Sequence, residues 1–310
     1  MTASAQPNRD NLPPPSVEEV AEGVYAYVQP DGSWWINNTG FLAGSRAATV
    51  IDLCSTEART RAFLDAVAEV ANGPVQTVVN THAHGDHTHG NCLTLPGATI
   101  VGHQRARESI QQMGVGGPLL DAIWPGVEWG TLEAAPPVLT FTDRVTLWVD
   151  DTEVQLIHLG PAHTDNDVIA WLPATRVLFA GDLVFNGGHP NNVGGSIPGT
   201  IAALDALEAL APSVIVPGHG GICDVAVLDE QRGYCRWIES VAADAVRSSV
   251  TPLEAARSTD LGDYAGWLDT ERVAGNLHRA MGEITGDEVN VAAAFGDMVE
   301  LNGGPLRCLA

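Results

Sequence analysis

Thr81-His82-Ala83-His84-Gly85-Asp86-His87 places three imidazoles and one carboxylate within six residues. The stretch directly follows residues 75–80, an apolar run that predicts a buried strand. Imidazole and carboxylate groups are typical ligands of divalent ions such as zinc. We therefore expect a metal site in a polar loop that a rigid strand holds in place, with the rest of the chain bringing further ligands to it.

The composition is that of a globular protein. The chain has 310 residues, of which 45% are hydrophobic and 17% are charged, so it can bury a substantial core. No window is apolar over the roughly 18 residues that a membrane-spanning helix needs. The first 20 residues also lack the basic and apolar regions of a secretory signal. We expect neither a membrane span nor export.

The charge balance is strongly acidic, with 38 Asp and Glu against 15 Lys and Arg, which gives a net charge of −23. Binding to nucleic acid or to an anionic membrane requires clustered basic residues, so we expect neither partner. The five Cys residues include no Cys-x-x-Cys pair. This pattern favours a reducing cytoplasm over a disulfide framework.

Hydrophobic periodicity divides the chain into regions. Residues 1–16 are rich in proline and lack periodicity, which predicts a flexible N-terminal arm. Residues 17–222 contain two similar sets of strands and helices, each ending in a loop with candidate ligands, and an early antiparallel meander includes residues 34–36. This order predicts an α/β fold with two packed sheets and helices outside, an αββα sandwich. The Gly- and Pro-rich composition of segment 114–137 predicts an insertion loop. Beyond the core we expect a helical C-terminal region at 223–301 and a tail at 302–310.

Further candidate ligands follow later strands, where a rigid scaffold can aim a side chain into a cleft. They are His163, Asp182 and His219, each close to Gly or Pro. Five imidazoles and two carboxylates exceed the needs of one tetrahedral ion and suit two ions. Neighbouring residues that could orient the ligands are Thr81, Thr164, Asp165 and Asn166.

The ordered set His82-x-His84-x-Asp86-His87, His163, Asp182 and His219 resembles the metallo-β-lactamase superfamily, over roughly residues 23–220. The resemblance implies that His82, His84 and His163 hold one metal ion. It implies that Asp86, His87 and His219 hold the second, and that Asp182 bridges the two. True metallo-β-lactamases usually carry Cys where Asp182 stands, so the pattern is more similar to hydroxyacylglutathione hydrolases and lactonases.

The resemblance also implies an activity, namely hydrolysis of a small-molecule ester, thioester or lactone by a hydroxide that bridges two divalent ions. Zinc is the default metal, and iron or manganese would suit the same ligands. Asp86 could accept or relay a proton. Two alternatives stay open: hydrolysis of a β-lactam amide, and an iron-dependent oxidation of persulfides on the same fold.

Substrate contacts are harder to predict. Trp34 and Trp35 lie in a turn that could flank the cleft, although both could equally pack in the core or at a subunit surface. His189 follows Asp182 closely and could contact the substrate, although a turn histidine is the simpler interpretation. Arg232, Arg236 and Arg272 could meet an anionic group, but single Arg residues on amphipathic helices usually form surface ion pairs. The Trp-bearing loops are compatible with a lid or with the interface of a homo-oligomer.

Overall fold

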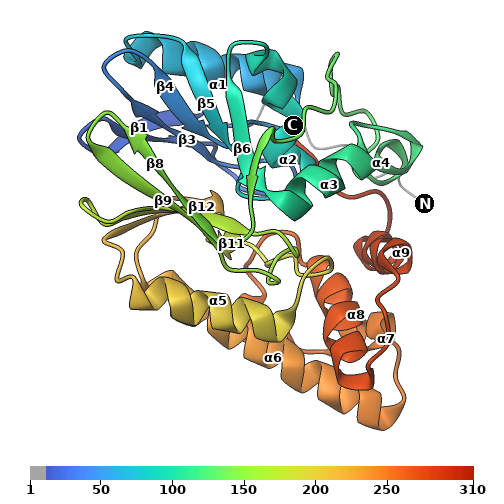
Figure 1. Ribbon diagram of the computed structural model, residues 1–310. Helices are drawn as coiled ribbons and strands as arrows, with labels where there is room; N and C mark the ends of the chain where they lie inside the picture. The colour runs from blue at the N-terminus through green and yellow to red at the C-terminus, as the bar shows by residue number, and fades with distance from the viewer. Residues whose placement is uncertain (1–11) are drawn as a thin grey trace.

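Two sheets pack face to face, and helices cover their outer faces (Figure 1). The computed structural model describes residues 12–310, so most of the predicted N-terminal arm lies outside the described residues. Within that range, no helix is both long enough and apolar enough to cross a membrane.

The first sheet contains seven strands that neighbour one another in chain order. They are β1 (Ser16–Ala21), β2 (Val24–Val28), β3 (Thr39–Ala43), β4 (Ala48–Ile51), β5 (Val75–Val79), β6 (Thr99–His103) and β7 (Leu139–Phe141). Strands β1 to β4 are antiparallel, which confirms the predicted meander, and β4 to β7 are parallel. The carboxyl ends of the parallel strands therefore share one edge, where the His-rich loop begins.

The second sheet contains five strands in the order β12-β11-β10-β9-β8. They are β8 (Arg144–Val149), β9 (Thr152–His158), β10 (Val168–Leu172), β11 (Val177–Phe185) and β12 (Val214–His219). Only β11 and β12 are parallel; the other pairs are antiparallel. Strands β8 and β9 form one antiparallel hairpin, and β10 and β11 form another.

Side-chain alternation along the strands separates the inner core from the outer layers, because successive residues of a strand face opposite sides. On β10, Val168 and Ala170 belong to the core between the sheets. Their neighbours Ile169 and Trp171 instead pack under the helices of the second sheet. Both faces of this strand are covered, which explains its continuous apolar sequence.

The helices and short 3-10 turns of the described residues are α1 (Glu57–Val70), α2 (Gly85–Thr88), η2 (His89–Thr94), α3 (Gln104–Met113), α4 (Pro118–Ile123), α5 (Ile197–Ala209), α6 (Ala226–Ser248), α7 (Pro252–Ser258), η3 (Gly262–Tyr264), α8 (Arg272–Thr285) and α9 (Val291–Asn302). Helix α1 packs Phe63 and Val67 on the first sheet, and α5 packs Leu204 and Leu207 under the second. Helix α6 lies beside α5 on the same side (Figure 1). The four layers confirm the predicted αββα sandwich.

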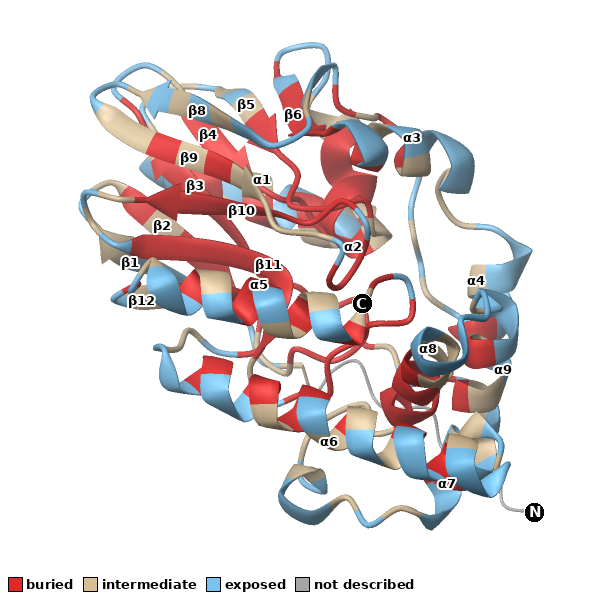
Figure 2. Cartoon of the chain, turned by 60° about the horizontal axis from the view of Figure 1, so that its bottom comes forward, coloured by how far each residue is buried: buried red, intermediate tan, exposed pale blue. Residues whose placement is uncertain are grey.

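The C-terminal helices share a separate hydrophobic cluster. Tyr234 and Ile238 of α6, Leu277 of α8 and Met298 of α9 are all buried in it. In Figure 2 the central strands β3, β4, β10 and β11 are largely buried, whereas α5 and α6 alternate buried and exposed residues along their length. The chain continues past α9 to Leu306, which is 4% exposed and donates its backbone N–H to the carbonyl oxygen of Ile123 at 2.9 Å.

Three local expectations differ from the structure. A strand, β1, begins at Ser16, where the sequence predicted only the end of an arm; most of its residues are exposed, so it gives little apolar signal. Residues 34–36 form a turn instead of a strand, and Trp35 adopts a positive φ of 67°. The segment 114–137 contains α4, which starts with proline after Gly117.

Candidate metal centre

Seven predicted ligands meet at the rim where the strands of both sheets end. The loop after β5 carries His82 and His84, and the short helix α2 carries Asp86 and His87. His163 lies in the β9–β10 connection. Asp182 and His219 lie within β11 and β12, where the sequence placed them just past a strand. The β11–β12 register shifts on both sides of Gly181, so the pairing is irregular where Asp182 projects.

The first group consists of His82, His84, His163 and Asp182. The Nδ1 atom of His84 lies 3.2 Å from Nε2 of His82 and 2.8 Å from Nε2 of His163. The Oδ2 atom of Asp182 lies 3.3 Å from Nε2 of His163. One atom from each residue lies within 4.8 Å of the others, so the four residues could hold one metal ion.

The second group consists of Asp86, His87, His219 and again Asp182. The Nε2 atom of His219 lies 3.3 Å from Oδ2 of Asp86 and 3.3 Å from Oδ2 of Asp182. The Nε2 atom of His87 lies 3.0 Å from Oδ1 of Asp182. Asp182 is therefore common to both groups and uses both of its oxygens.

Hydrogen bonds on the outer side of the rings fix which nitrogen faces inward. The Nδ1 atom of His163 donates to the carbonyl oxygen of Asn191, and that of His219 donates to the carbonyl oxygen of Gly32 at 3.1 Å. A carbonyl oxygen can only accept, so a neutral ring in this position carries its lone pair on Nε2. Both rings, when neutral, thus present a lone pair to the centre.

The inward-facing atoms fit a cation. Nε2 of His87 and Oδ1 of Asp182 are both buried and have no hydrogen-bond partner, although they lie 3.0 Å apart. Buried polar atoms without partners are costly. A neutral His87 ring, whose Nδ1–H donates to Asp52, turns the lone pair of Nε2 toward the carboxylate oxygen, so in that state two acceptors face each other and repel. A divalent cation shared by the lone pairs would satisfy them, so the donor set fits the metal that its chemistry predicts.

The charges of the centre agree with this conclusion. Burial lowers the pKa of His82 well below its ordinary value and that of His163 to about 3, so both rings are neutral, as ligands must be. Burial also disfavours a charge on His219, but the carboxylates of Asp182 and Asp86 together outweigh it and raise the pKa of His219 to about 9. Burial and Asp182 oppose each other in the same way at His87, and its pKa rises well above the ordinary value. The carboxylates thus favour positive charge at the centre, and a metal ion would supply it.

Asp52 is a residue of this centre that the sequence did not single out. It follows β4 directly, has a left-handed φ of 59° and is buried. Its carboxylate accepts hydrogen bonds from the Nδ1 of His87 at 2.8 Å and from the backbone N–H and hydroxyl of Thr81 at 2.8 and 2.7 Å. Asp52 directly follows a strand, as the ligands in the loop after β5 do. The same sequence signal could therefore have identified it.

Asp52→Asn is expected to weaken metal binding about 10- to 100-fold, because a partner that orients a metal-binding histidine typically contributes that much. The dissociation constant for zinc is measured by titrating the metal-free protein with zinc in a calorimeter. Asp65→Asn, at an exposed position of α1, is the matched control and should bind zinc like the wild type. Unchanged affinity in Asp52→Asn would show that His87 needs no help from Asp52.

The loop that carries His163 is held by a buried carboxylate. Asp167 accepts hydrogen bonds from the backbone N–H groups of Ala162 and Thr164 and from the Thr164 hydroxyl. Burial raises the pKa of Asp167 to about 7. Of the predicted orienting residues, Thr81 contacts Nδ1 of His82 at 3.0 Å, and Thr164 acts through Asp167. The side chain of Asn166 donates a hydrogen bond to that of Asp165, and neither side chain contacts the imidazole of His82 or His163.

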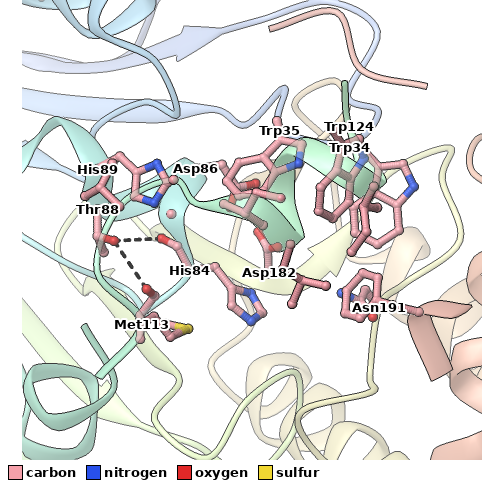
Figure 3. A pocket seen from close by; sticks show the side chains of 18 of the residues that line it. Trp34, Trp35, His84, Asp86, Thr88, His89, Met113, Trp124, Asp182 and Asn191 are labelled. Atoms are coloured by element: carbon pink, nitrogen blue, oxygen red, sulfur yellow. Dashed lines mark hydrogen bonds between the residues drawn. The ribbon is translucent and has the colours of Figure 1, made fainter. Parts of the chain in front are cut away.

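A cavity of about 570 Å³ opens above the centre, and its lining includes His84, Asp86 and Asp182. Figure 3 shows the indole rings of Trp34, Trp35 and Trp124 grouped beside these residues. Both predicted tryptophans therefore line the cavity. They are also nearly buried, with Trp34 donating its Nε1–H to Glu271 at 2.7 Å.

His189 lies apart from this lining. Its ring is fully buried, 5.3 Å from the ring of Tyr234 and 5.8 Å from that of Trp267. Burial lowers the pKa of His189 to about 4. The structure thus brings Trp34 and Trp35 to the cavity but does not bring His189 there.

Known proteins resemble the chain in sequence and in fold. Residues 32–219, more than half of the chain, match the family described as the Metallo-beta-lactamase superfamily. A type 2 metallo-beta-lactamase of Bacteroides fragilis is 24% identical over 239 residues, which cover 73% of this chain and 88% of that protein. A hydroxyacylglutathione hydrolase of Polaromonas sp. strain JS666 is 27% identical over 249 residues, covering 76% of this chain and 84% of that protein.

The solved structure of a metallo-beta-lactamase from Pontibacter korlensis has a TM-score of 0.60 at 19% identity and covers 72% of this chain and 99% of that one. This likeness shows the shared fold, which agrees with the layers described above. The match over residues 32–219 shows the family: the chain belongs to the metallo-beta-lactamase superfamily, whose members are metal-dependent hydrolases.

Proposed function

We propose that the chain is a dinuclear metal-dependent hydrolase that cleaves an ester, thioester or lactone bond in a small molecule. The observation that carries this proposal is the sharing of Asp182 between two groups of potential ligands. A single ion would need only one of these groups. Relatives among hydroxyacylglutathione hydrolases support the choice of bond.

In this proposal His82, His84 and His163 hold one ion, Asp86, His87 and His219 hold the other, and Asp182 contributes to both. Zinc is the default, with iron or manganese as alternatives. When bound, two such ions supply Lewis acidity and make hydroxide available at neutral pH.

The residues of the chain have complementary tasks. Asp86 is 9% exposed and lines the cavity, so it can accept a proton at its carboxylate close to a bound substrate. Asp182 supplies negative charge between the two groups. The indoles of Trp34 and Trp35 exclude water beside the centre, which strengthens electrostatic interactions there.

We further propose that residues 17–222 form the catalytic core and that residues 223–301 complete the cavity, because Arg272 and Phe295 line it. The tail at 302–310, the cytoplasmic location and the homo-oligomer stay predictions from sequence.

Metal removal tests the function directly. Treatment with a chelator is expected to abolish hydrolysis, and addition of about two zinc ions per chain should restore it, because the ligands fall into two groups. Elemental analysis gives the stoichiometry. One iron per chain together with oxygen uptake on a persulfide would instead identify an oxidoreductase and overturn the proposal.

β-Lactam hydrolysis is the second candidate, favoured by the similarity to the enzyme of Bacteroides fragilis. A panel that contains a nitrophenyl ester, a thioester, an acyl lactone and nitrocefin separates the two. We expect the highest kcat/KM with one of the first three substrates. A clear preference for nitrocefin would establish the second candidate.

A further inference from the structure

We infer that the substrate carries an uncharged apolar chain, alkyl or aryl, which lies in the cavity beside the metal centre. This inference rests on the proposed function, since it names the substrate of the same site. The chain would occupy the apolar part of the cavity while its carbonyl group lies near Asp86 and Asp182. The volume of about 570 Å³ is within the range of pockets that bind small organic ligands.

The walls of the cavity are apolar and come from separate parts of the sequence. Leu120 and Ile123 of α4 form one wall, Phe295 of α9 forms another, and Ile110 lies at the end of α3. Trp124 connects them, with its ring 5.8 Å from that of Phe295 and 5.2 Å from that of Trp34. Binding of an apolar group to such a surface is favourable, because it releases water from both.

The mouth of the cavity is apolar as well. Met113, Leu119 and Val291 line it and are 54%, 63% and 46% exposed. Large apolar side chains grouped at an opening commonly mark a binding site. Met113 appears at the edge of the cavity in Figure 3, opposite the indoles. A chain longer than the cavity would leave through this opening and remain in contact with apolar surface.

Anionic substrates find little support in the same cavity. Arg272 is the one Lys or Arg among the described residues that line it. Its guanidinium stacks 4.0 Å from the ring centroid of Trp34, and its Nη2 lies 2.9 Å from Oδ2 of Asp269. Nη1 donates to the carbonyl oxygen of His189 at 2.9 Å. The charge of Arg272 is thus already balanced, and it serves as part of the wall.

The net charge of −23 further opposes the approach of an anion. The Nε of Arg272 nevertheless has no hydrogen-bond partner. The same holds for the indole Nε1 atoms of Trp35 and Trp124, which also line the cavity. An anionic series therefore belongs in the test, because these N–H groups could donate to a carboxylate.

The test uses zinc-loaded enzyme and nitrophenyl esters from acetate to decanoate, each beside its analogue with a terminal carboxylate. We expect kcat/KM to rise about two- to fourfold per methylene until the cavity is full, since each buried methylene contributes about 0.8 kcal/mol at most. The carboxylate analogues should react at least about tenfold more slowly at equal length. A flat length dependence, or a preference for the anionic series, would overturn the inference.

A pair of surface variants locates the effect. Leu119→Glu should reduce the decanoate-to-acetate ratio of kcat/KM about tenfold or more, because it places a charge at the apolar mouth. Val138→Glu is the control, since Val138 is 70% exposed and does not line the cavity; the ratio should stay as in the wild type. Equal ratios in both variants would contradict the assignment of the chain to this cavity.

Binding can be followed without turnover. Decanamide, a neutral amide, should change the tryptophan fluorescence of the metal-free protein, whereas acetamide should not, because Trp34, Trp35 and Trp124 line the cavity. No response to decanamide would count against the inference. Failure of every ester, acetate included, alongside normal binding of decanamide would instead contradict the proposed function and leave the apolar site standing.

Discussion

Asp182→Asn is expected to lower kcat/KM of the metal-loaded enzyme by roughly 10³-fold, because metal ions contribute several kcal/mol to such reactions and this residue belongs to both ligand groups. The substitution keeps the shape of the side chain but removes its negative charge. Both Oδ1 and Oδ2 lie 3.0 to 3.3 Å from imidazole Nε2 atoms, so no water-filled space separates the carboxylate from the predicted ligands.

The loss should come with a change in metal content. Elemental analysis is expected to find fewer than two ions per chain, and zinc should raise the Tm of the variant less than that of the wild type, since stabilisation follows binding. Asp65→Asn again serves as the control. A variant with full metal content and full activity would exclude Asp182 from the centre.

Gly218→Ala is expected to reduce activity by about 10²-fold, although the new methyl group carries no charge. A Cβ at this position would lie 1.9 Å from Oδ1 of Asp182 and 2.7 Å from the carbonyl carbon of Gly181. The carboxylate must therefore move, and misplacement of a catalytic group by about 1 Å can cost about 10²-fold. Crowding of this kind should also lower the free energy of unfolding by about 1–3 kcal/mol.

Gly221→Ala is the matched control for this change. A Cβ on Gly221 would meet only the Nδ2 of Asn186, at an ordinary 3.8 Å. Its activity, measured on the same ester, and its urea midpoint should equal those of the wild type. If Gly218→Ala were as active as Gly221→Ala, the backbone of β12 could shift to make room for the new methyl group, and the prediction would be wrong.

The sequence predicted the layers well because each strand carries its own signal. Alternation on β8 and the continuous apolar run of β10 reflect whether one face or both faces are covered. The candidate ligands were also predictable, since His and Asp residues placed at strand ends have few other roles in such numbers. Local patterns could not reveal β1, whose residues are mostly exposed.

The cavity could not be predicted, because its walls depend on contacts between distant parts of the chain. Trp34 and Phe295 lie 6.0 Å apart by ring centroids but are separated by most of the sequence. Arg272 illustrates the same difficulty. A lone arginine on a helix suggests a surface ion pair, yet this one is 2% exposed, and only the fold places Trp34 beneath its guanidinium.

The bond between the N–H of Leu306 and the carbonyl oxygen of Ile123 has a practical consequence. Ile123 is the last residue of α4 and lines the cavity. The segment around Leu306 therefore supports a wall of the substrate site. Leu309 is also only 7% exposed. A purification tag fused beside these buried residues would disturb the contacts that support this wall, and substrate binding would change with it.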